Sequence, residues 1–233
     1  MQEEFINIAA HELRTPIQPI LGLTETIIYH TKDTEQAKLL QVVSRNAKRL
    51  QRLTEDILDI TKIESQSLYL IKERFNLIEI VDSAIADSSR NQIKKEYKDN
   101  IKLELLSRED IFVEADKNRI YQVILNLLDN AIKFTKQEGA IAITAAVEKK
   151  DNHDVVVVSI KDNGPGIDPE ILPRLFTKFA TKSRGGGTGL GLFICKSIIE
   201  AHGGKIWAEN NINEKGATFS FSLPLSKNSS SLA

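Results

Sequence analysis

Hydrophobic residues recur with helical spacing through the first 64 residues of the chain. From Glu35 to Glu64 they stand three, four or seven positions apart, at Val43, Leu50, Leu53, Ile57 and Ile60, with Asn46 in the one missing position. An earlier stripe of the same kind comprises Phe5, Ile8, Leu13, Ile17, Ile20, Leu21, Thr24 and Ile27. The polar segment HTKDTE separates the two stripes. This pattern predicts two long amphipathic helices joined as a hairpin.

A single helical hairpin cannot bury both hydrophobic stripes, because half of each stripe remains in water. Pairing two hairpins into a four-helix bundle buries the rest. We therefore expect residues 1–67 to form a helical hairpin that makes a dimeric four-helix bundle, and the chain to be a homodimer.

Beyond the hairpin the pattern alternates between strands and helices. Runs rich in β-forming residues lie at 101–106, 111–113, 140–147, 155–160, 205–208 and 217–223, with helical patterns between them. Over residues 76–225 we expect an α+β sandwich, with a mixed sheet covered by helices on one face. Residues 68–75 are interpreted as a linker, and the small polar residues at 226–233 as a disordered tail.

Composition narrows the classes of partner. The chain has 233 residues, of which 41% are hydrophobic and 27% charged, enough for one sizeable core or two small ones. Its 31 basic and 32 acidic residues give a net charge of -1, so neither nucleic acid nor an anionic membrane is expected as the main partner. Small ligands and proteins remain.

Cysteine content and hydropathy bear on the compartment. The single cysteine, Cys195, lies in the apolar run GLFICKSII and is expected to be a helical core thiol in a reducing compartment. No apolar run approaches the ~20 residues that span a bilayer, and the first residues lack the pattern of an export signal. We expect a soluble, cytoplasmic segment.

Four stretches of the second half carry chemistry, and the first is RIYQVILNLLDNAIKFT. Asn126, Asn130 and Lys133 fall at helical spacing on a face away from the apolar residues, so two amide oxygens and an ammonium share one stripe. Such a stripe suits Mg²⁺, which takes hard oxygen ligands and keeps several waters, beside phosphates. A solvated helix face with ordinary asparagines would look the same.

The second stretch, VVVVSIKDNGPGI, is a buried-type strand that ends in Asp162 and a turn. Gly164 and Gly166 would let a ligand approach the backbone, and the Asp162 carboxylate could accept a hydrogen bond from an exocyclic amine such as that of adenine. A plain turn of Asp-Asn-Gly type is the alternative.

The third stretch, SRGGGTGLGLFICKSIIEAHGG, is a glycine loop that leads into an apolar helix, with Thr188 as a candidate N-cap. Free backbone N–H groups at a helix start bind phosphate oxygens. The glycines match neither a Walker loop nor GxGxxG, and a flexible linker is the alternative. The fourth stretch, LPRLFTKFATK, carries Phe176 and Phe179 at helical spacing, which by themselves indicate core.

Taken together and in order, five segments resemble the catalytic portion of two-component sensor histidine kinases. HELRTP resembles the phosphoacceptor box, NLLDNAIKFT the N box, DNGPGI and GGGTGLGL the two glycine boxes, and LFTKF the F box. The resemblance runs from about Phe5 to Leu223. It implies a dimeric hairpin domain followed by an ATP-binding sandwich of the fold shared with gyrase and Hsp90-type ATPases.

The resemblance also implies a reaction. A nitrogen of His11 attacks the γ-phosphorus of ATP, and the phosphoryl group then passes to an aspartate of a response-regulator protein. Glu12 resembles the acidic residue that holds or deprotonates the histidine, although neighbouring helical residues point about 100° apart. Thr15, one turn beyond His11, matches the residue that orients water for dephosphorylating the regulator.

By the same resemblance, the second domain binds ATP with Mg²⁺. Asn130 and Asn126 are implied as metal ligands, Lys133 as a phosphate ligand and Asp162 as the adenine ligand, with Phe134 over the nucleotide. Gly164 and Gly166 are implied on the adenine side, and phosphate contacts are implied for Gly187, Thr188, Gly189, Leu190 and Gly191. The lid is short, and either Lys182 or Arg184 is implied at the γ-phosphate.

Other features are interpreted as structural. TPIQ resembles a helix start, with Thr15 as N-cap, but the family keeps one kinked helix there, and we expect the kink at Pro16. His30, His153 and His202 lie in or near turns and are expected to be solvated, and Gly216 to be structural. Because His11 lies only ten residues from the start, we expect a fragment of a longer, membrane-bound or soluble sensor.

Two rival hypotheses remain. In an ATPase of gyrase or chaperone type, the hairpin would serve dimerisation only. Those relatives carry a glutamate to activate water where this chain has Asn126, which cannot act as a base. A dimeric scaffold that binds nucleotide without phosphoryl transfer is the other hypothesis.

Overall fold

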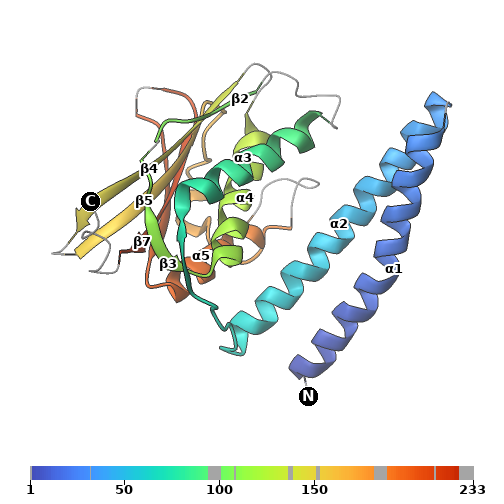
Figure 1. Cartoon of the computed structure of the whole chain (residues 1–233), viewed down its shortest axis with the longest axis horizontal. Helices are drawn as coiled ribbons and strands as arrows, with labels where there is room; N and C mark the ends of the chain where they lie inside the picture. Colours follow the sequence, from blue (N-terminus) through green and yellow to red (C-terminus); the bar gives the residue numbers. More distant parts are fainter. Residues whose placement is uncertain are drawn as a thin grey trace. The chain divides into compact units, whose positions relative to one another are not determined.

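The computed structural model divides the chain into two compact units, Met1–Leu68 and Tyr69–Ala233. It describes residues 2–31, 33–93, 101–107, 109–135, 139–150, 153–180, 188–212 and 214–225, with the backbone alone at 2–11, 14, 90–93 and 150. The expected tail at 226–233 lies outside this range. Figure 1 shows the elements of both units.

The first unit is a helical hairpin of α1 (Gln2–His30) and α2 (Thr34–Glu64). The carboxylate of Asp33 caps α2 by accepting hydrogen bonds from the backbone N–H groups of Glu35 at 2.8 Å and Gln36 at 3.2 Å. The predicted hairpin is therefore confirmed, including the polar connection between its helices.

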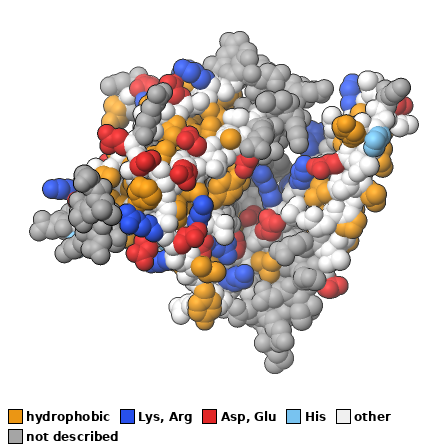
Figure 2. Space-filling model, in the orientation of Figure 1, with side chains coloured by type: hydrophobic (Ala, Val, Ile, Leu, Met, Phe, Trp, Pro, Cys, Tyr) orange, Lys and Arg blue, Asp and Glu red, His pale blue; other side chains and the backbone are white. Residues whose placement is uncertain are grey.

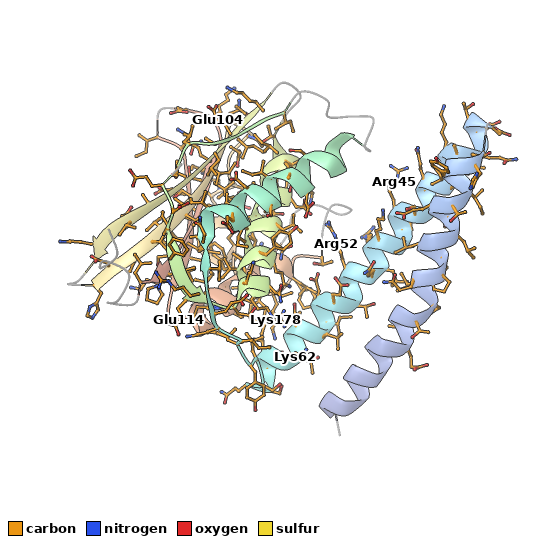
Figure 3. All side chains as sticks on the ribbon, in the orientation of Figure 1. Arg45, Arg52, Lys62, Glu104, Glu114 and Lys178 are labelled. Carbon is orange, nitrogen blue, oxygen red and sulfur yellow. The ribbon has the colours of Figure 1, made fainter. Side chains whose placement is uncertain are left out.

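The hairpin has a thin core. Ile17, Leu21 and Ala47 form its cluster of buried hydrophobic residues. Arg45 and Arg52 project from α2 on the side away from α1 (Figure 3). The two helices bury a narrow seam between them.

Helix α1 continues through Pro16 and Pro19. Pro16 lacks the N–H that would bond the carbonyl one turn earlier, a change that costs about 3 kcal/mol in a helix interior. Because the helix does not begin at Pro16, Thr15 is not an N-cap. The single helix expected from the family resemblance is confirmed.

The second unit contains two sheets and a layer of helices. Its elements are β1 (Glu73–Asn76), α3 (Leu77–Ile93), β2 (Lys102–Leu105), β3 (Phe112–Ala115), α4 (Lys117–Phe134), β4 (Ala140–Lys150), β5 (His153–Asp162), η1 (Leu172–Arg174), α5 (Gly191–Ala201), β6 (Lys205–Asn210) and β7 (Ala217–Pro224). The main sheet has the order β2-β4-β5-β7-β6, with β2 parallel to β4 and the other neighbours antiparallel. The expected mixed sheet is confirmed.

Helices α3, α4 and α5 lie together on one face of the five-stranded sheet (Figure 1). Their buried side chains meet those of β4, β5 and β7 in the core, where Ile120, Ile124, Leu127, Ile143, Ile160, Ile194, Ile198 and Phe221 are among the largest fully buried residues. Cys195 is buried within α5, as predicted. This packing fixes the positions of α4, which carries the N box, and of α5, which begins within the second glycine box.

Three sequence predictions about this unit need correction. Strand β1, which pairs antiparallel with β3, was not predicted and overlaps the segment interpreted as a linker. His202 was expected to be solvated, but it is 4% exposed because it is packed at the end of α5. Phe179 was expected in the core at helical spacing, but it is 69% exposed and lies in a turn beyond η1.

Within the described part of the chain, no helix combines the length and the apolar character needed to span a bilayer.

Candidate functional site

Helix α4 presents the predicted asparagine stripe. Its apolar face is buried at Ile120, Val123, Ile124, Leu127, Leu128 and Ala131. Asn126 and Asn130 are half-buried, one turn apart, at the margin of that face. Their amide oxygens are therefore held by a rigid helix while they remain accessible to solvent.

The start of α5 lies against this stripe. A Cβ atom built on Gly191 would stand 3.7 Å from the side-chain atoms of Asn126. The packing of α4 on α5 thus brings the N box and the second glycine box together, although 65 positions of sequence, from 126 to 191, separate them. Glycine at 191 leaves the amide of Asn126 without a neighbouring side chain on this side.

Asp162, the last residue of β5, is only 4% exposed. Its Oδ1 accepts hydrogen bonds from the backbone N–H of Gly164 at 2.8 Å and of Ala217 at 3.3 Å. Among the described residues, no group donates a hydrogen bond to its Oδ2. Burial raises the pKa of this carboxyl, and the two backbone hydrogen bonds oppose the rise.

The turn after Asp162 touches the end of α4. A Cβ atom on Gly164 would lie 2.8 Å from the carbonyl oxygen of Phe134 and 2.9 Å from Oδ1 of Asp162. Any larger residue at 164 must therefore displace one of them. The Phe134 ring is half-exposed, and the Lys133 ammonium lies 4.9 Å from its centroid. Burial lowers the pKa of Lys133.

Gly166 is held against the end of β6. Its φ of +84° favours glycine, and a Cβ atom there would meet Oδ1 of Asn210 at 2.8 Å. The Asn210 side chain makes two hydrogen bonds to Ile167, the residue after Gly166. Its Oδ1 accepts from the Ile167 N–H at 2.6 Å, and its Nδ2 donates to the Ile167 carbonyl at 2.9 Å. The loop beside Asp162 is therefore fixed by side-chain hydrogen bonds.

The F box and the second glycine box are joined through their backbones. The Phe179 N–H donates to the Gly189 carbonyl at 2.9 Å, and both residues have positive φ, +61° and +70°. A positive φ is costly for a phenylalanine and marks a backbone that its surroundings constrain. The exposed ring of Phe179 is a consequence of this turn.

The start of α5 differs from the prediction in one respect. Leu190, not Thr188, is the N-cap residue, and it makes no side-chain capping bond. The hydroxyl of Thr188, two residues before Leu190, instead accepts a hydrogen bond from the Leu190 N–H at 3.1 Å. Lys182, Arg184 and Gly187 lie outside the described residues.

In the hairpin, the described side chains of Glu12 and Thr15 are exposed on α1. His11 lies within the same helix, and its side chain is outside the described range. Because α1 is continuous, Thr15 stands one turn beyond His11 on the same helix face. The hairpin and the candidate site around Asn126 and Asp162 belong to different compact units.

Sequence reasoning missed the support that Asn211 gives to the site, whereas Gly216 was expected to be structural. Asn211 donates from Nδ2 to the Asp162 carbonyl at 2.8 Å and accepts from the Thr218 hydroxyl at 2.7 Å. Gly216, with a φ of +115°, packs so closely that a Cβ atom would stand 1.9 Å from the Asp162 carbonyl oxygen. The polar residues that follow β6 in the sequence were the only signal for Asn211, and they did not indicate Asp162 as its partner.

A further cation also escaped the sequence reading. Lys178 lies in the F box with its ammonium 5.1 Å from the centroid of the Phe193 ring on α5 (Figure 3). The contact places this ammonium near the first turn of α5, the helix that begins at Gly191. A basic residue between two aromatic residues gave no spacing signal of its own.

Two family models match the chain. Residues 1–66 match the His Kinase A (phospho-acceptor) domain. Residues 115–227 match the histidine kinase-, DNA gyrase B-, and HSP90-like ATPase family. The two matches fall on different compact units.

The relatives of the chain agree with the two family models. Sensor protein SrrB of Staphylococcus aureus strain N315 is 37% identical over 235 aligned positions, which cover 96% of this chain and 38% of SrrB. The structure of full-length ShkA in complex with AMPPNP superposes with a TM-score of 0.72 at 26% identity, over 95% of this chain and 45% of ShkA.

Histidine kinase ThkA gives two further matches. Its complex with response regulator TrrA has a TM-score of 0.59 at 34% identity, over 96% of this chain and 61% of that chain. Its isolated catalytic domain is 39% identical, with a TM-score of 0.55, over 66% of this chain and 95% of that domain. The chain thus spans less than half the length of SrrB and nearly all of the ThkA catalytic domain. With both family models matched in order, the chain belongs to the two-component sensor histidine kinases.

Proposed function

We propose that this chain is the kinase core of a sensor: it transfers the γ-phosphoryl group of ATP to His11 and then to an aspartate of a response regulator. The observation that carries the proposal is that motifs far apart in sequence meet along α4: Gly191 lies against Asn126, and Gly164, beside Asp162, lies against the last residue of the helix. The solved relatives ShkA, bound to AMPPNP, and ThkA, bound to TrrA, support the ATP and regulator roles.

Asp162 supports recognition of adenine. Its Oδ1 is engaged by backbone N–H groups of the protein, so Oδ2 is the acceptor left for the exocyclic amine of the base. Gly164 keeps side chains away from this edge, and the exposed Phe134 ring is available to cover the base. A buried carboxylate that accepts from an amino group also disfavours a base that presents a carbonyl there.

The other end of the site supports phosphate binding. Gly191 begins α5 without a side chain, and backbone N–H groups at a helix start bind phosphate oxygens. Lys133 and Lys178 supply positive charge from α4 and from the F box. Lys182 or Arg184 remains the proposed cation at the γ-phosphate.

The donor set fits a magnesium ion. Asn126 and Asn130 offer two hard amide oxygens, and Mg²⁺ completes its octahedron with waters and substrate phosphates. The described residues contain no cluster of acidic, histidine or cysteine side chains that would form a metal cage of its own. When bound, the ion would neutralise phosphate charge.

In the transfer step, a lone pair on His11 forms a bond to the γ-phosphorus while the bond from phosphorus to the ADP oxygen breaks. Neutral imidazole is available near pH 7 because its unperturbed pKa is about 6.5. Glu12 would hold the imidazole and accept the proton lost from its other nitrogen. The phosphoryl group next leaves the histidine nitrogen for a carboxylate oxygen of the regulator.

The hairpin surface supports dimerisation. Leu13, Ile20 and Ile27, each seven residues apart on α1, are 44–47% exposed. The matching stripe of α2 comprises Val43, Leu50 and Ile57, each 45–46% exposed. Hydrophobic side chains are visible along the surface of the hairpin (Figure 2). A second hairpin would cover both stripes in a four-helix bundle.

The function is tested by incubating the chain with γ-labelled ATP and Mg²⁺. A kinase retains the label on the protein in an acid-labile, alkali-stable form, as expected for a phosphohistidine. An ATPase of gyrase type would instead release labelled phosphate steadily, and a scaffold would do neither. Transfer of the label from the protein to a receiver domain tests the second step.

Thr15→Ala is predicted to separate the two activities of α1. The hydroxyl lies one turn from His11 and can position a water for hydrolysis of the regulator's aspartyl phosphate, whereas transfer to His11 needs no such water. We expect autophosphorylation within a few-fold of the parent, and removal of phosphate from the regulator slowed by about tenfold or more.

The measurement follows decay of phosphorylated regulator with ADP present, beside His11 labelling and a melting curve. Thr26→Ala, an exposed threonine further along α1, is the matched control. Equal losses in both activities would show that Thr15 serves only the helix.

A further inference from the structure

His202 terminates α5 with both ring nitrogens engaged. Its Nε2 accepts a hydrogen bond from the backbone N–H of Asp116 at 3.0 Å, and its Nδ1 lies 2.8 Å from the carbonyl oxygen of Ile198. An N–H can only donate and a carbonyl can only accept. The imidazole is therefore neutral, with its proton on Nδ1 and its lone pair on Nε2.

Asp116 extends this contact to two other segments. It is the N-cap of α4, where Oδ1 accepts from the Arg119 N–H at 3.1 Å. Its Oδ2 accepts from the backbone N–H of Ile71 at 2.9 Å, in the segment that enters the second unit ahead of β1. We call Ile71, Asp116 and His202 the entry junction.

The entry junction connects the far ends of the two helices that carry the phosphate and metal motifs. It joins the start of α4 to the end of α5, whereas Gly191, at the start of α5, meets Asn126 in the middle of α4. Ten residues of α4 separate Asp116 from Asn126, which is about 15 Å along a helix. A change at the entry junction can therefore alter how α4 and α5 meet without touching a nucleotide.

We propose that neutral His202 is a positioning residue for phosphoryl transfer. Its imidazole clamps the start of α4 to the end of α5 and, through Asp116, ties both helices to the segment at Ile71. The inference rests on the proposed function for its catalytic consequence. The clamp itself rests on two hydrogen bonds of a 4% exposed imidazole.

Protonation of His202 would break the clamp. A proton on Nε2 would place two donors, Nε2–H and the Asp116 N–H, against each other. Burial lowers the pKa of His202; the Ile198 carbonyl raises it, Lys72 ahead of β1 lowers it, and Asp116 at the start of α4 raises it. Within the described residues, β6 and β7, which also pack on α5, contribute no charged group to this balance.

The sign of the pH effect follows. The folded pKa lies below that of the unfolded chain, so the unfolded state binds more protons between the two values. The stabilisation is complete above the ordinary histidine pKa of about 6.5 and is lost as the pH falls below it toward the lowered folded pKa.

Two amide variants of the full chain test the clamp. In His202→Gln the amide oxygen takes the place of Nε2 and keeps the acceptor for Asp116 without titrating. In His202→Asn the amide nitrogen takes the place of Nδ1 and keeps only the bond to Ile198. His153→Gln, on the exposed start of β5, is the control for removing a histidine.

The readouts are amide hydrogen exchange at Asp116 and Ile71, the affinity for ADP, and the rate of autophosphorylation at saturating ATP. We expect His202→Asn to accelerate exchange and to lower affinity and rate by about fivefold, the equivalent of one neutral hydrogen bond. His202→Gln should retain protection and most of the activity. Between pH 7.5 and 5.5, the melting temperature of the unliganded parent and of His153→Gln should fall more than that of His202→Gln.

Equal behaviour of the Gln and Asn variants in exchange and affinity would overturn the proposal. So would a parent whose melting temperature depends on pH no more than that of His202→Gln. If His202→Asn does not fold, the pH dependence of the melting temperature of the parent and of His202→Gln still decides whether the clamp exists. A parent that binds no ADP would overturn the proposed function instead, while hydrogen exchange would continue to report on the entry junction.

Discussion

His11→Gln is expected to abolish labelling of the protein by γ-labelled ATP, while the affinity for ADP stays within about twofold of the parent. Glutamine has no basic lone pair to attack phosphorus, and its helix propensity leaves α1 intact. The nucleotide motifs lie in the other compact unit, Tyr69–Ala233, so the substitution does not alter them. Labelling is followed in acid and in alkali, and ADP affinity by calorimetry.

His30→Gln is the matched control, because it removes an exposed histidine from the last turn of the same helix. It should leave both labelling and ADP affinity unchanged. Label that persists on His11→Gln would overturn the assignment of His11. Loss of ADP affinity together with loss of label would instead indicate that the substitution disturbs the whole chain.

The hairpin and the core of α4 could be predicted from the sequence because their signal is local. In α4, residues such as Ile120, Val123, Ile124 and Leu127 repeat at three and four positions, and all are buried. The same repeat placed Asn126 and Asn130 on another face of the helix, and in the structure both are half-buried at the margin of the buried face. Periodicity reports which face of an element is buried, but not what that face meets.

The entry junction could not be predicted, because its partners are distant in sequence. His202 lies 86 positions from Asp116, and its burial depends on where α5 ends relative to α4. A histidine before two glycines looks like part of a solvated turn when only its neighbours are considered. The same reasoning failed for Asn211, whose partner Asp162 is 49 positions away.

Backbone conformation was the second source of error. Two phenylalanines three residues apart favour a buried helix face, but Phe179 adopts a φ of +61° where its N–H pairs with Gly189. The hydrogen bond comes from a later motif, and it overrides the local preference. Thr188 was displaced from the N-cap position for a related reason, since its hydroxyl accepts from Leu190 within the loop.

Asp162→Asn is predicted to weaken ADP binding without weakening the fold. The asparagine oxygen can still accept from the Gly164 and Ala217 N–H groups, but its amide nitrogen replaces Oδ2 and faces the adenine amine as a second donor. Loss of a hydrogen bond to a charged group, about 1.5–3 kcal/mol, corresponds to roughly 10- to 150-fold in affinity. Asp154→Asn, on the exposed part of β5, is the control.

Two measurements distinguish recognition from structure in this variant. A purine nucleotide that lacks the 6-amino group should bind the parent and Asp162→Asn alike, whereas ADP should distinguish them. Because burial raises the pKa of Asp162, its stabilisation is present at low pH and is lost as the pH rises through the raised value. Asparagine does not titrate, so the unliganded variant should melt at or above the temperature of the parent at pH 7.5, and this difference should shrink as the pH is lowered. Unchanged affinity for ADP would exclude the adenine role, and a lower melting temperature at pH 7.5 would show that the carboxylate supports the fold.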